Sequence, residues 1–446
     1  MKKMKKTLIV MSSVAAFFTQ SNAQNLCVTG RYASNTFTAV TVTSGIAYGA
    51  NTTAGGSNQI LTMDVYQPTG DVETNRPLII LAHGGSFIFG SSTTSDMVTL
   101  STEFAKKGFV CVSINYRLGL TPFDSTGAIK AVLRAAQDMK ASIRFFYKDK
   151  LTTNTYKIDT TNIFIGGSSA GAITALHTAY LKRSCQVTTY ISQTSLTALG
   201  DLEGNSGNPC YSTKVKGVIN LCGALGTANW LEAGDIPLVS MHGTVDGTVK
   251  YGRGKVNPGV PIMYLDGSRV IKQKATAVGV NNSFYTFNNA DHVPFMSGGT
   301  AVTQAAYMDT TIKFVRDFLV AQLGCTVTPL QAPNTPFGTA TLIPFTACTS
   351  NTQQNFCTAQ SIKTFETNLV QTIYPNPSSD KVTLVFVNSN TEHTITLMDI
   401  TGKIVKSDKT MASEFTFEKS NIQAGIYFLK IAEPNGQSSV HKIIFN

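Results

Sequence analysis

The sequence predicts an α/β fold with a mostly parallel, doubly wound sheet, followed by a small all-β sandwich domain. Between residues 60 and 323, apolar strand-like runs alternate with helical patterns of roughly 10–20 residues, which is the order of a parallel sheet covered by helices on both faces. The run 78–82 is continuously apolar, as in strands buried on both faces. After Cys325 the helical patterns stop and short alternating runs replace them. These observations predict two domains of different class.

Each element of the first domain follows from its local pattern. Apolar runs predict strands at residues 78–82, 109–116, 162–165, 215–222, 237–241 and 283–287. Amphipathic patterns predict helices at 95–108, 124–147, 172–181, 267–278 and 307–323. Gly108 and Gly324 stand where a left-handed residue commonly ends a helix. In the second domain, alternation predicts strands at 381–386, 393–398, 425–431 and 441–445.

The chain begins with the three-part pattern of a secretory signal peptide. Four lysines precede an apolar run at residues 8–18, and the small residues Ser21 and Ala23 follow it. A membrane-spanning helix would need about 20 apolar residues, so the run is too short to be an anchor. We therefore expect a signal peptide at 1–23, the α/β domain at 24–325, a linker rich in Thr, Pro, Ala and Asn at 326–369, and the β domain at 370–446.

Composition excludes several classes of protein. The chain has 36 Lys plus Arg against 26 Asp plus Glu, a net charge of +10, of which four charges belong to the predicted signal peptide. No Lys/Arg-rich run remains that would bind nucleic acid, and no later apolar run is long enough to cross a bilayer. Neither Cys-x-x-Cys nor His-x-x-x-His spacing occurs, so we expect no metal site and no cofactor.

Eight cysteines follow the predicted signal peptide, and export permits disulfides. Cys185 and Cys210 flank one polar stretch, and Cys348 and Cys357 flank another, so each of these pairs could form a bond. Cys111 and Cys222 lie in apolar runs and are expected to be buried thiols. Spacing alone does not fix the connectivity.

The strongest chemical signal is Gly167-Ser168-Ser169-Ala170-Gly171, a G-x-S-x-G stretch between a predicted strand and a predicted helix. In that context the central serine occupies a strained turn that exposes its hydroxyl above the sheet edge. Ser168 also fits a G-x-S-x-A pattern with Gly166. We prefer Ser169 as the nucleophile, because Ser-Ala-Gly opens the helix.

A serine nucleophile needs a base, and on this type of sheet the chain order is Ser, acid, His. Five of the six histidines are poorly placed by position: His83, His177, His242, His393 and His441. His292, in a loop after the strand 283–287, remains as the expected base. Asp246 follows the strand 237–241 and is the expected orienting acid. Its rivals are Asp201, Asp235, Asp266 and Asp291.

Acyl transfer also needs donors for the developing oxyanion. His83-Gly84-Gly85-Ser86 follows the strand 78–82, and consecutive glycines let backbone N–H groups approach a ligand closely. We expect the N–H groups of Gly85, Ser86 and Ala170 to form the oxyanion hole.

These motifs carry a family resemblance over residues 60–323. Together with Asn115-Tyr116-Arg117-Leu118-Gly119 and Asp291-His292-Val293-Pro294-Phe295, they resemble the α/β-hydrolase fold in its carboxylesterase and hormone-sensitive-lipase-like branch. The resemblance implies a serine esterase that uses Ser169, Asp246 and His292. Ser86 stands where a third glycine often follows His-Gly-Gly, and it keeps the backbone N–H.

The tail resembles the C-terminal sorting domain of Bacteroidetes type IX secretion. The matching pieces are Tyr374-Pro375-Asn376-Pro377, residues 397–403, Gly425-Ile426-Tyr427 and the closing run 442–445. This resemblance implies export past the outer membrane, to the cell surface or the medium, with the secretion machinery as a partner.

The expected function is therefore a secreted serine carboxylester hydrolase, acting through an acyl-enzyme on short-chain, acetyl, feruloyl or polyester-type esters, including polymer-linked ones. One alternative is a serine peptidase of the prolyl-oligopeptidase type. Another is a non-catalytic adhesion protein on a hydrolase scaffold, which a missing triad member would favour.

Overall fold

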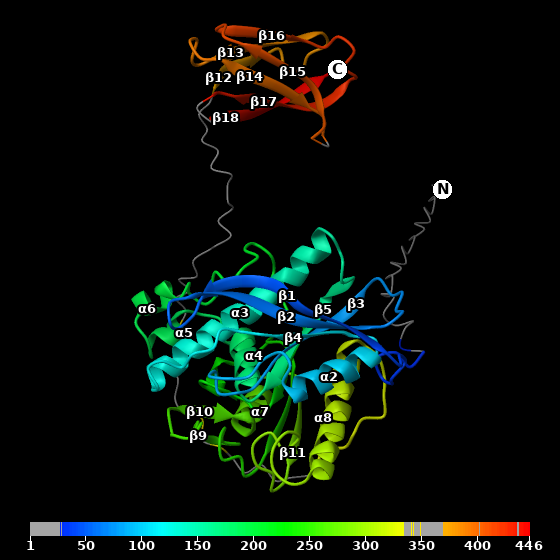
Figure 1. Ribbon diagram of the computed structural model, residues 1–446, viewed down its shortest axis with the longest axis vertical. Coiled ribbons are helices and arrows are strands. Elements are labelled where there is room, and N and C mark those ends of the chain that lie inside the picture. Colours follow the sequence, from blue (N-terminus) through cyan, green and yellow to red (C-terminus); the bar gives the residue numbers. More distant parts are fainter. Residues whose placement is uncertain are drawn as a thin grey trace, which may run out of the picture. The chain divides into compact units, whose positions relative to one another are not determined.

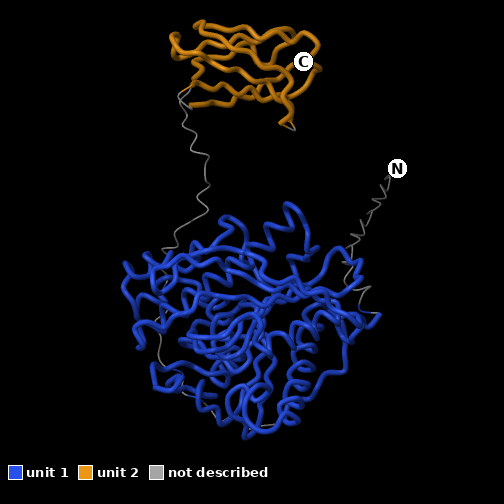
Figure 2. Tube along the Cα trace, in the orientation of Figure 1, with its two compact units in different colours: residues 1–354 blue, residues 355–446 orange. Residues whose placement is uncertain are grey.

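The computed structural model describes residues 27, 29–333, 340, 342, 348, 369–400, 402–434 and 437–446. The chain divides into two compact units, residues 1–354 and 355–446 (Figure 2). The predicted signal peptide, most of the predicted linker and Cys357 lie outside the described residues. In the described part of the chain, no helix is long and apolar enough to cross a membrane.

An eight-stranded sheet forms the centre of the first unit, in the order β1-β2-β4-β3-β5-β6-β8-β11. The strands from β4 to β11 in this order pair in parallel, whereas β1 and β2 join the edge antiparallel. The local sequence pattern predicts neither β1 nor β2. The bounds are β1 Val40–Thr52, β2 Asn58–Pro68, β3 Arg76–Ala82, β4 Val110–Ile114, β5 Ile158–Ser168, β6 Gly217–Leu221, β8 Leu238–Gly243 and β11 Asn282–Phe287.

Helices cover both faces of this sheet, as the alternating pattern predicts (Figure 1). Side chains of β3 alternate between two cores: Leu78 and Ile80 belong to one, and Ile79 and Leu81 to the other. The first core packs against α3, α4 and α7, and the second against α2 and α8. The bounds are α2 Ser95–Lys106, α3 Ser125–Leu151, α4 Ala170–Tyr180, α7 Ser268–Ala277 and α8 Ala301–Gln322.

The strand order reverses at β3, and this reversal positions the candidate site. β4 lies on one side of β3, and β5 lies on the other. In open α/β sheets, ligands bind at such a switch point, beyond the carboxyl ends of the strands. Ala82 at the end of β3 pairs with Gly167 near the end of β5. The His83 loop and the Ser169 turn therefore leave the sheet side by side.

Shorter elements surround this edge of the sheet. The polar stretch after α4 contains two short helices, and a three-stranded antiparallel sheet, β7-β10-β9, precedes α7. Their bounds are α5 Cys185–Thr188, α6 Gln193–Ala198, β7 Ala224–Leu225, η1 Ala228–Trp230, β9 Arg253–Lys255 and β10 Tyr264–Gly267.

Two long-range disulfides close the first unit, and neither pairing suggested by spacing occurs. Cys27 bonds to Cys325, and Cys185 bonds to Cys348. The predicted Cys185–Cys210 and Cys348–Cys357 pairs are therefore wrong: the fold brings together cysteines 298 and 163 residues apart, which local spacing cannot reveal. Cys111 and Cys222 are buried, as expected.

Part of the predicted linker packs on the first unit. Ala340 is buried in the first core, and Leu342 packs against the same core. The Gln273 side chain of α7 makes two 2.8 Å hydrogen bonds with the backbone of Ala340, one to its carbonyl and one from its N–H. With the Cys185–Cys348 bond, these contacts tie Ala340, Leu342 and Cys348 to the α/β unit.

The second unit is all-β, as predicted. It contains one sheet in the order β12-β13-β16 and one in the order β15-β14-β17-β18, both antiparallel. Alternate side chains such as Leu384, Ile395 and Leu429 form a core of their own. The bounds are β12 Val370–Tyr374, β13 Lys381–Phe386, β14 His393–Met398, β15 Ile404–Thr410, β16 Glu414–Glu418, β17 Gly425–Ala432 and β18 Ser438–Phe445.

Candidate active site

Ser169 occupies a sharp turn between β5 and α4. Its backbone has φ 53° and ψ −117°, a strained conformation for a residue with a side chain. Gly171 makes the turn possible, because a Cβ there would come within 1.9 Å of the Ala82 carbonyl oxygen. The glycine lets α4 start directly against β3, and the Ser169 hydroxyl is held at the edge of the sheet.

Three side chains from different elements form a hydrogen-bonded relay. Ser169 Oγ lies 2.8 Å from His292 Nε2, and His292 Nδ1 lies 2.7 Å from Asp246 Oδ2. Ser169 follows β5, Asp246 follows β8, and His292 follows β11. The three strands end at one edge of the parallel sheet, which explains how residues 123 and 46 positions apart meet. The arrangement has the geometry of a nucleophile, a base and an orienting acid.

Asp246 is buried and held from several directions. Its Oδ1 accepts hydrogen bonds from the Thr248 and Val249 N–H groups at 2.9 and 2.8 Å. Burial raises the pKa of the Asp246 carboxyl, but hydrogen bonds from His242 and His292 outweigh burial and hold the pKa well below its ordinary value. Asp246 is therefore a carboxylate at neutral pH.

His242 is a second histidine on the same carboxylate, although its position in the sequence marks it only as a poor candidate for the base. Its Nε2 lies 2.8 Å from the Val249 carbonyl and 3.1 Å from Asp246 Oδ2. Both partners can only accept, so Nε2 carries a proton. Nδ1 lies 2.7 Å from Ser268 Oγ, and the imidazole is fully buried. The sequence signal for this contact is the spacing in His242-Gly-Thr-Val-Asp246, which places His242 and Asp246 in one turn.

The loop after β3 holds the predicted oxyanion donors beside Ser169. Gly85 has φ 109°, and its carbonyl accepts the Ile88 and Phe89 N–H groups in a tight turn. Within the described part of the chain, no backbone carbonyl accepts from the Gly85 or Ser86 N–H. Ala170 is the first residue of α4, where an N–H has no intrahelical acceptor. These three N–H groups remain a proposed oxyanion hole.

The loop is anchored by Tyr116. The Tyr116 hydroxyl donates to the His83 carbonyl at 2.8 Å, and the two rings stack with centroids 4.4 Å apart. Tyr116 belongs to the Asn-Tyr-Arg-Leu-Gly stretch, whose structural role the sequence alone does not reveal.

Ser168 and the rival acids make other contacts. Ser168 Oγ donates to Asp96 Oδ2 at 2.5 Å, beneath the Ser169 turn. Asp291 Oδ1 accepts from the Gly247 and His292 N–H groups, so this carboxylate fastens two loops. Asp266 pairs with Arg253 at 2.6 Å. None of these contacts involves the His292 imidazole.

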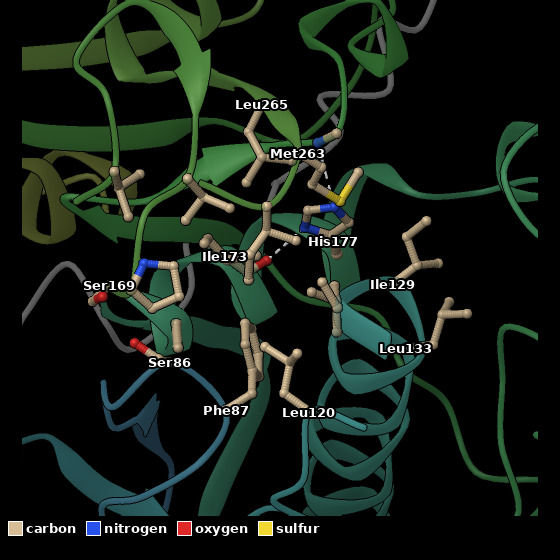
Figure 3. A pocket seen from close by; sticks show the side chains of 18 of the residues that line it. Ser86, Phe87, Leu120, Ile129, Leu133, Ser169, Ile173, His177, Met263 and Leu265 are labelled. Carbon is tan, nitrogen blue, oxygen red and sulfur yellow. Dashed lines mark hydrogen bonds between the residues drawn. The ribbon is translucent and has the colours of Figure 1, made fainter. Parts of the chain in front are cut away.

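Two cavities meet at Ser169. A deep one, whose lining is almost entirely apolar, runs from Ser86 and Ser169 to His177 (Figure 3). A second, more polar cavity is lined by Gly84, His292 and Ser297 among others. Among the described residues, no group of three His, Cys, Asp or Glu side chains is arranged to hold a metal ion.

Two family models match the chain. Residues 63–233 match the family described as BD-FAE, and residues 372–446 match the secretion system C-terminal sorting domain. The first match spans the elements from β2 to η1, including the Ser169 turn, and the second spans β12 to β18.

Curated relatives match only short stretches. Carboxylesterase 3B of Mus musculus is 41% identical over 75 residues, which are 16% of this chain and 12% of that protein. Gut esterase 1 of Caenorhabditis briggsae is 31% identical over 113 residues, 25% of this chain and 19% of that protein. The chain thus matches about an eighth to a fifth of the length of these relatives.

Among solved structures, Thermogutta terrifontis esterase 2 phosphorylated by paraoxon is 20% identical, with a TM-score of 0.46, over 64% of this chain and 95% of that one. The α/β sheet with helices on both faces agrees with the fold that the sequence predicts. The chain therefore carries a BD-FAE domain, of the esterase-like α/β-hydrolase class, followed by a C-terminal sorting domain of type IX secretion.

Proposed function

We propose that the chain is a secreted serine carboxylester hydrolase with Ser169 as nucleophile, His292 as general base and Asp246 as orienting acid. The observation that carries this proposal is the relay Ser169–His292–Asp246, with contacts of 2.8 and 2.7 Å. The BD-FAE match and the esterase relatives support the reaction class.

The reaction follows from the geometry in two half-reactions. Ser169 Oγ attacks the ester carbonyl carbon as its proton passes to His292 Nε2, and the carbonyl oxygen becomes an oxyanion facing the Gly85, Ser86 and Ala170 N–H groups. The intermediate collapses as the imidazolium gives its proton to the leaving alkoxide, leaving an acyl-enzyme. A water then loses its proton to His292, attacks the acyl carbon and releases the acid, and Ser169 recovers its proton.

Replacing Ser169 with alanine tests the proposal. Ser169→Ala should lower turnover of p-nitrophenyl butyrate by about a millionfold, while Ser168→Ala, the matched control one residue away, keeps the relay intact. A fluorophosphonate followed by peptide mass spectrometry should label Ser169 in the natural chain. An active Ser169→Ala variant would refute the assignment, and cleavage of a peptide substrate in preference to esters would favour a peptidase.

Export is the second part of the proposal. The sorting-domain match at residues 372–446 supports delivery to the cell surface or the medium, with the secretion machinery as the partner of the tail. The predicted signal peptide at 1–23 would carry the chain across the inner membrane first.

A further inference from the structure

The two cavities that meet at Ser169 differ in the side chains that line them. The deep cavity is enclosed by apolar side chains from α3, α4 and the 256–265 segment: Ile129, Val132, Leu133, Ile173, Val256, Ile262, Met263 and Leu265. The other cavity is wider open, and its lining mixes glycine and polar residues with apolar side chains such as Phe89 and Met296, with His292 in its wall. An ester bound at Ser169 extends into both, so each cavity receives one half of the substrate.

The route of the proton to the leaving group decides which cavity holds the alcohol part of the ester and which holds the acyl part. In the proposed reaction, His292 must protonate the leaving alkoxide, so the alcohol oxygen has to lie within hydrogen-bond reach of Nε2. Ser86 and Ser169 line both cavities, whereas His292 lines only the open one and Ala170 lines only the deep one. The alcohol therefore occupies the open cavity, and the acyl group enters the deep one.

The deep cavity follows one face of α4. Ser169, Ile173 and His177 line it at a spacing of four residues, so they form one row along the helix (Figure 3). Eight residues at about 1.5 Å rise each make a row of about 12 Å. With C–C bonds of about 1.5 Å, an extended alkyl chain of about eight to ten carbons covers that length.

The far part of the cavity carries no charge. Burial lowers the pKa of His177 to about 4, so the imidazole is neutral at pH 7. Its Nδ1 donates to the Ile173 carbonyl at 2.8 Å, and its Nε2 accepts the Gly226 N–H at 3.3 Å. Both ring nitrogens are engaged, and the ring presents carbon to an occupant.

Trp230 also lines this part without offering a polar contact. Its indole N–H has no hydrogen-bond partner among the described residues. The indole nitrogen is itself buried, so it is not exposed to an occupant of the cavity. An aromatic acyl group bearing a phenolic hydroxyl would bury that hydroxyl among apolar side chains, which costs free energy when no partner is present. An alkyl chain carries no such cost.

We propose that the deep cavity is an acyl pocket for straight-chain aliphatic acids of about six to ten carbons, with Ile173 and Ile129 as residues that set the chain length. This inference rests on the proposed function, because it assumes acyl transfer to Ser169.

A series of p-nitrophenyl esters from acetate to palmitate tests the pocket in the full chain. Each methylene buried should raise kcat/KM up to about fourfold. We expect a maximum near octanoate, at least about tenfold above acetate, and a fall beyond about twelve carbons, where the chain outgrows the row on α4.

Filling the pocket should move the optimum. Ile173→Phe should lower the octanoate-to-acetate ratio of kcat/KM by at least about tenfold, because the larger ring occupies the space of several methylenes. Ile129 is half-buried and lines the cavity from α3. Ile129→Trp is therefore the second filling variant, and it tests the proposal if Ile173→Phe does not fold. Thr178→Ala, on α4 outside this cavity, is the matched control and should keep the natural ratio.

The outcomes separate this inference from the function. A flat series, a maximum at acetate, or a higher kcat/KM for a feruloyl ester than for octanoate would overturn the acyl assignment while leaving the esterase intact. An unchanged chain-length profile in a folded filling variant would overturn it as well. Absence of hydrolysis across the series, with no fluorophosphonate labelling of Ser169, would instead refute the proposed function.

Discussion

At the residue scale, the site depends on one buried carboxylate. Asp246 receives two backbone N–H groups and two imidazoles, and these contacts outweigh its burial and keep its pKa low. A carboxylate whose pKa is lowered by folding adds stability above its unfolded pKa of about 4, and that stability is lost only as pH falls through the lower folded value. The carboxylate thus stays charged wherever His292 can act as a base.

Replacing Asp246 tests its role against its neighbour Asp291. Asp246→Asn should lower turnover by about ten-thousandfold, because an amide cannot hold His292 in the required tautomer. Asp291→Asn should cause a much smaller loss, since this carboxylate faces backbone N–H groups instead of the imidazole. Kinetics of both variants on p-nitrophenyl butyrate measure this; equal losses would show that the acid is wrongly assigned.

His177 should make stability depend on pH. Its pKa is lowered from 6.5 to about 4 by burial, so the unfolded chain binds a proton that the folded chain does not. Stability is therefore lost as pH falls from about 6.5 towards 4, by up to about 3 kcal/mol at the lower end.

Urea unfolding at pH 7 and pH 4.5 checks this expectation. The loss of stability between the two pH values should be smaller in His177→Gln than in the natural chain, because glutamine does not titrate. The His177→Gln variant retains the contributions of all other groups, including His83, whose pKa burial also lowers. An identical loss in both proteins would contradict a buried, neutral His177.

At the element scale, α3 is joined to the chain after β4 and to the loop before β6 by a buried ion pair. Arg117 and Asp138 are both buried and 2.9 Å apart. Ser206 Oγ also donates to Asp138, at 2.6 Å. Removing one partner of such a pair leaves an unpaired charge in the interior. Arg117 of the Asn-Tyr-Arg-Leu-Gly stretch therefore has a structural role: it links three segments of the α/β unit through Asp138.

Arg117→Met should lower the free energy of unfolding by about 3–5 kcal/mol. The matched control is Lys313→Met on α8, which breaks an ion pair with Asp309 whose two side chains are 50% and 60% exposed. That change should cost less than about 1 kcal/mol. Urea denaturation of both variants measures the difference, and similar losses would mean that the Arg117 pair contributes no more than a surface pair.

At the scale of the whole molecule, the two units have separate cores, and all proposed site residues lie between 85 and 292. Removing residues 370–446 should leave kcat and KM of the purified enzyme unchanged and should abolish its export. Activity in the medium and in cell fractions measures both. A large loss of activity on a soluble ester would show that the tail belongs to the catalytic unit.

The boundary of such a truncation matters. Ending the chain after Cys325 removes Ala340, which hydrogen-bonds to Gln273, and Cys348, which bonds to Cys185. That shorter chain should lose about 2–4 kcal/mol of stability relative to one ending at residue 369. Thermal unfolding of the two truncated chains compares them directly; equal stability would show that the contacts of Ala340 and Cys348 are dispensable.

Local patterns predicted much of the architecture. Strands β13 and β14 have the bounds that alternation predicts, and β3, α2 and α4 differ from expectation by a few residues. These elements could be predicted because hydrophobic periodicity and the positions of glycines are local features of the sequence. The strands β1 and β2 were not identified. β1 is an edge strand with mostly exposed residues, and in β2 polar residues interrupt the apolar pattern.

By itself, the sequence determined the class of each domain and the G-x-S-x-G turn. It also predicted Asp246 and His292 as partners of a serine in that turn, with Ser169 preferred, because the chain order of strands dictates which strand ends can meet. Only the tertiary structure decided that Ser169, not Ser168, faces His292, and that His242 shares the carboxylate of Asp246. It also decided the disulfide partners and the apolar cavity along α4. These features arise from contacts between residues far apart in the chain, and no local pattern of residues encodes them.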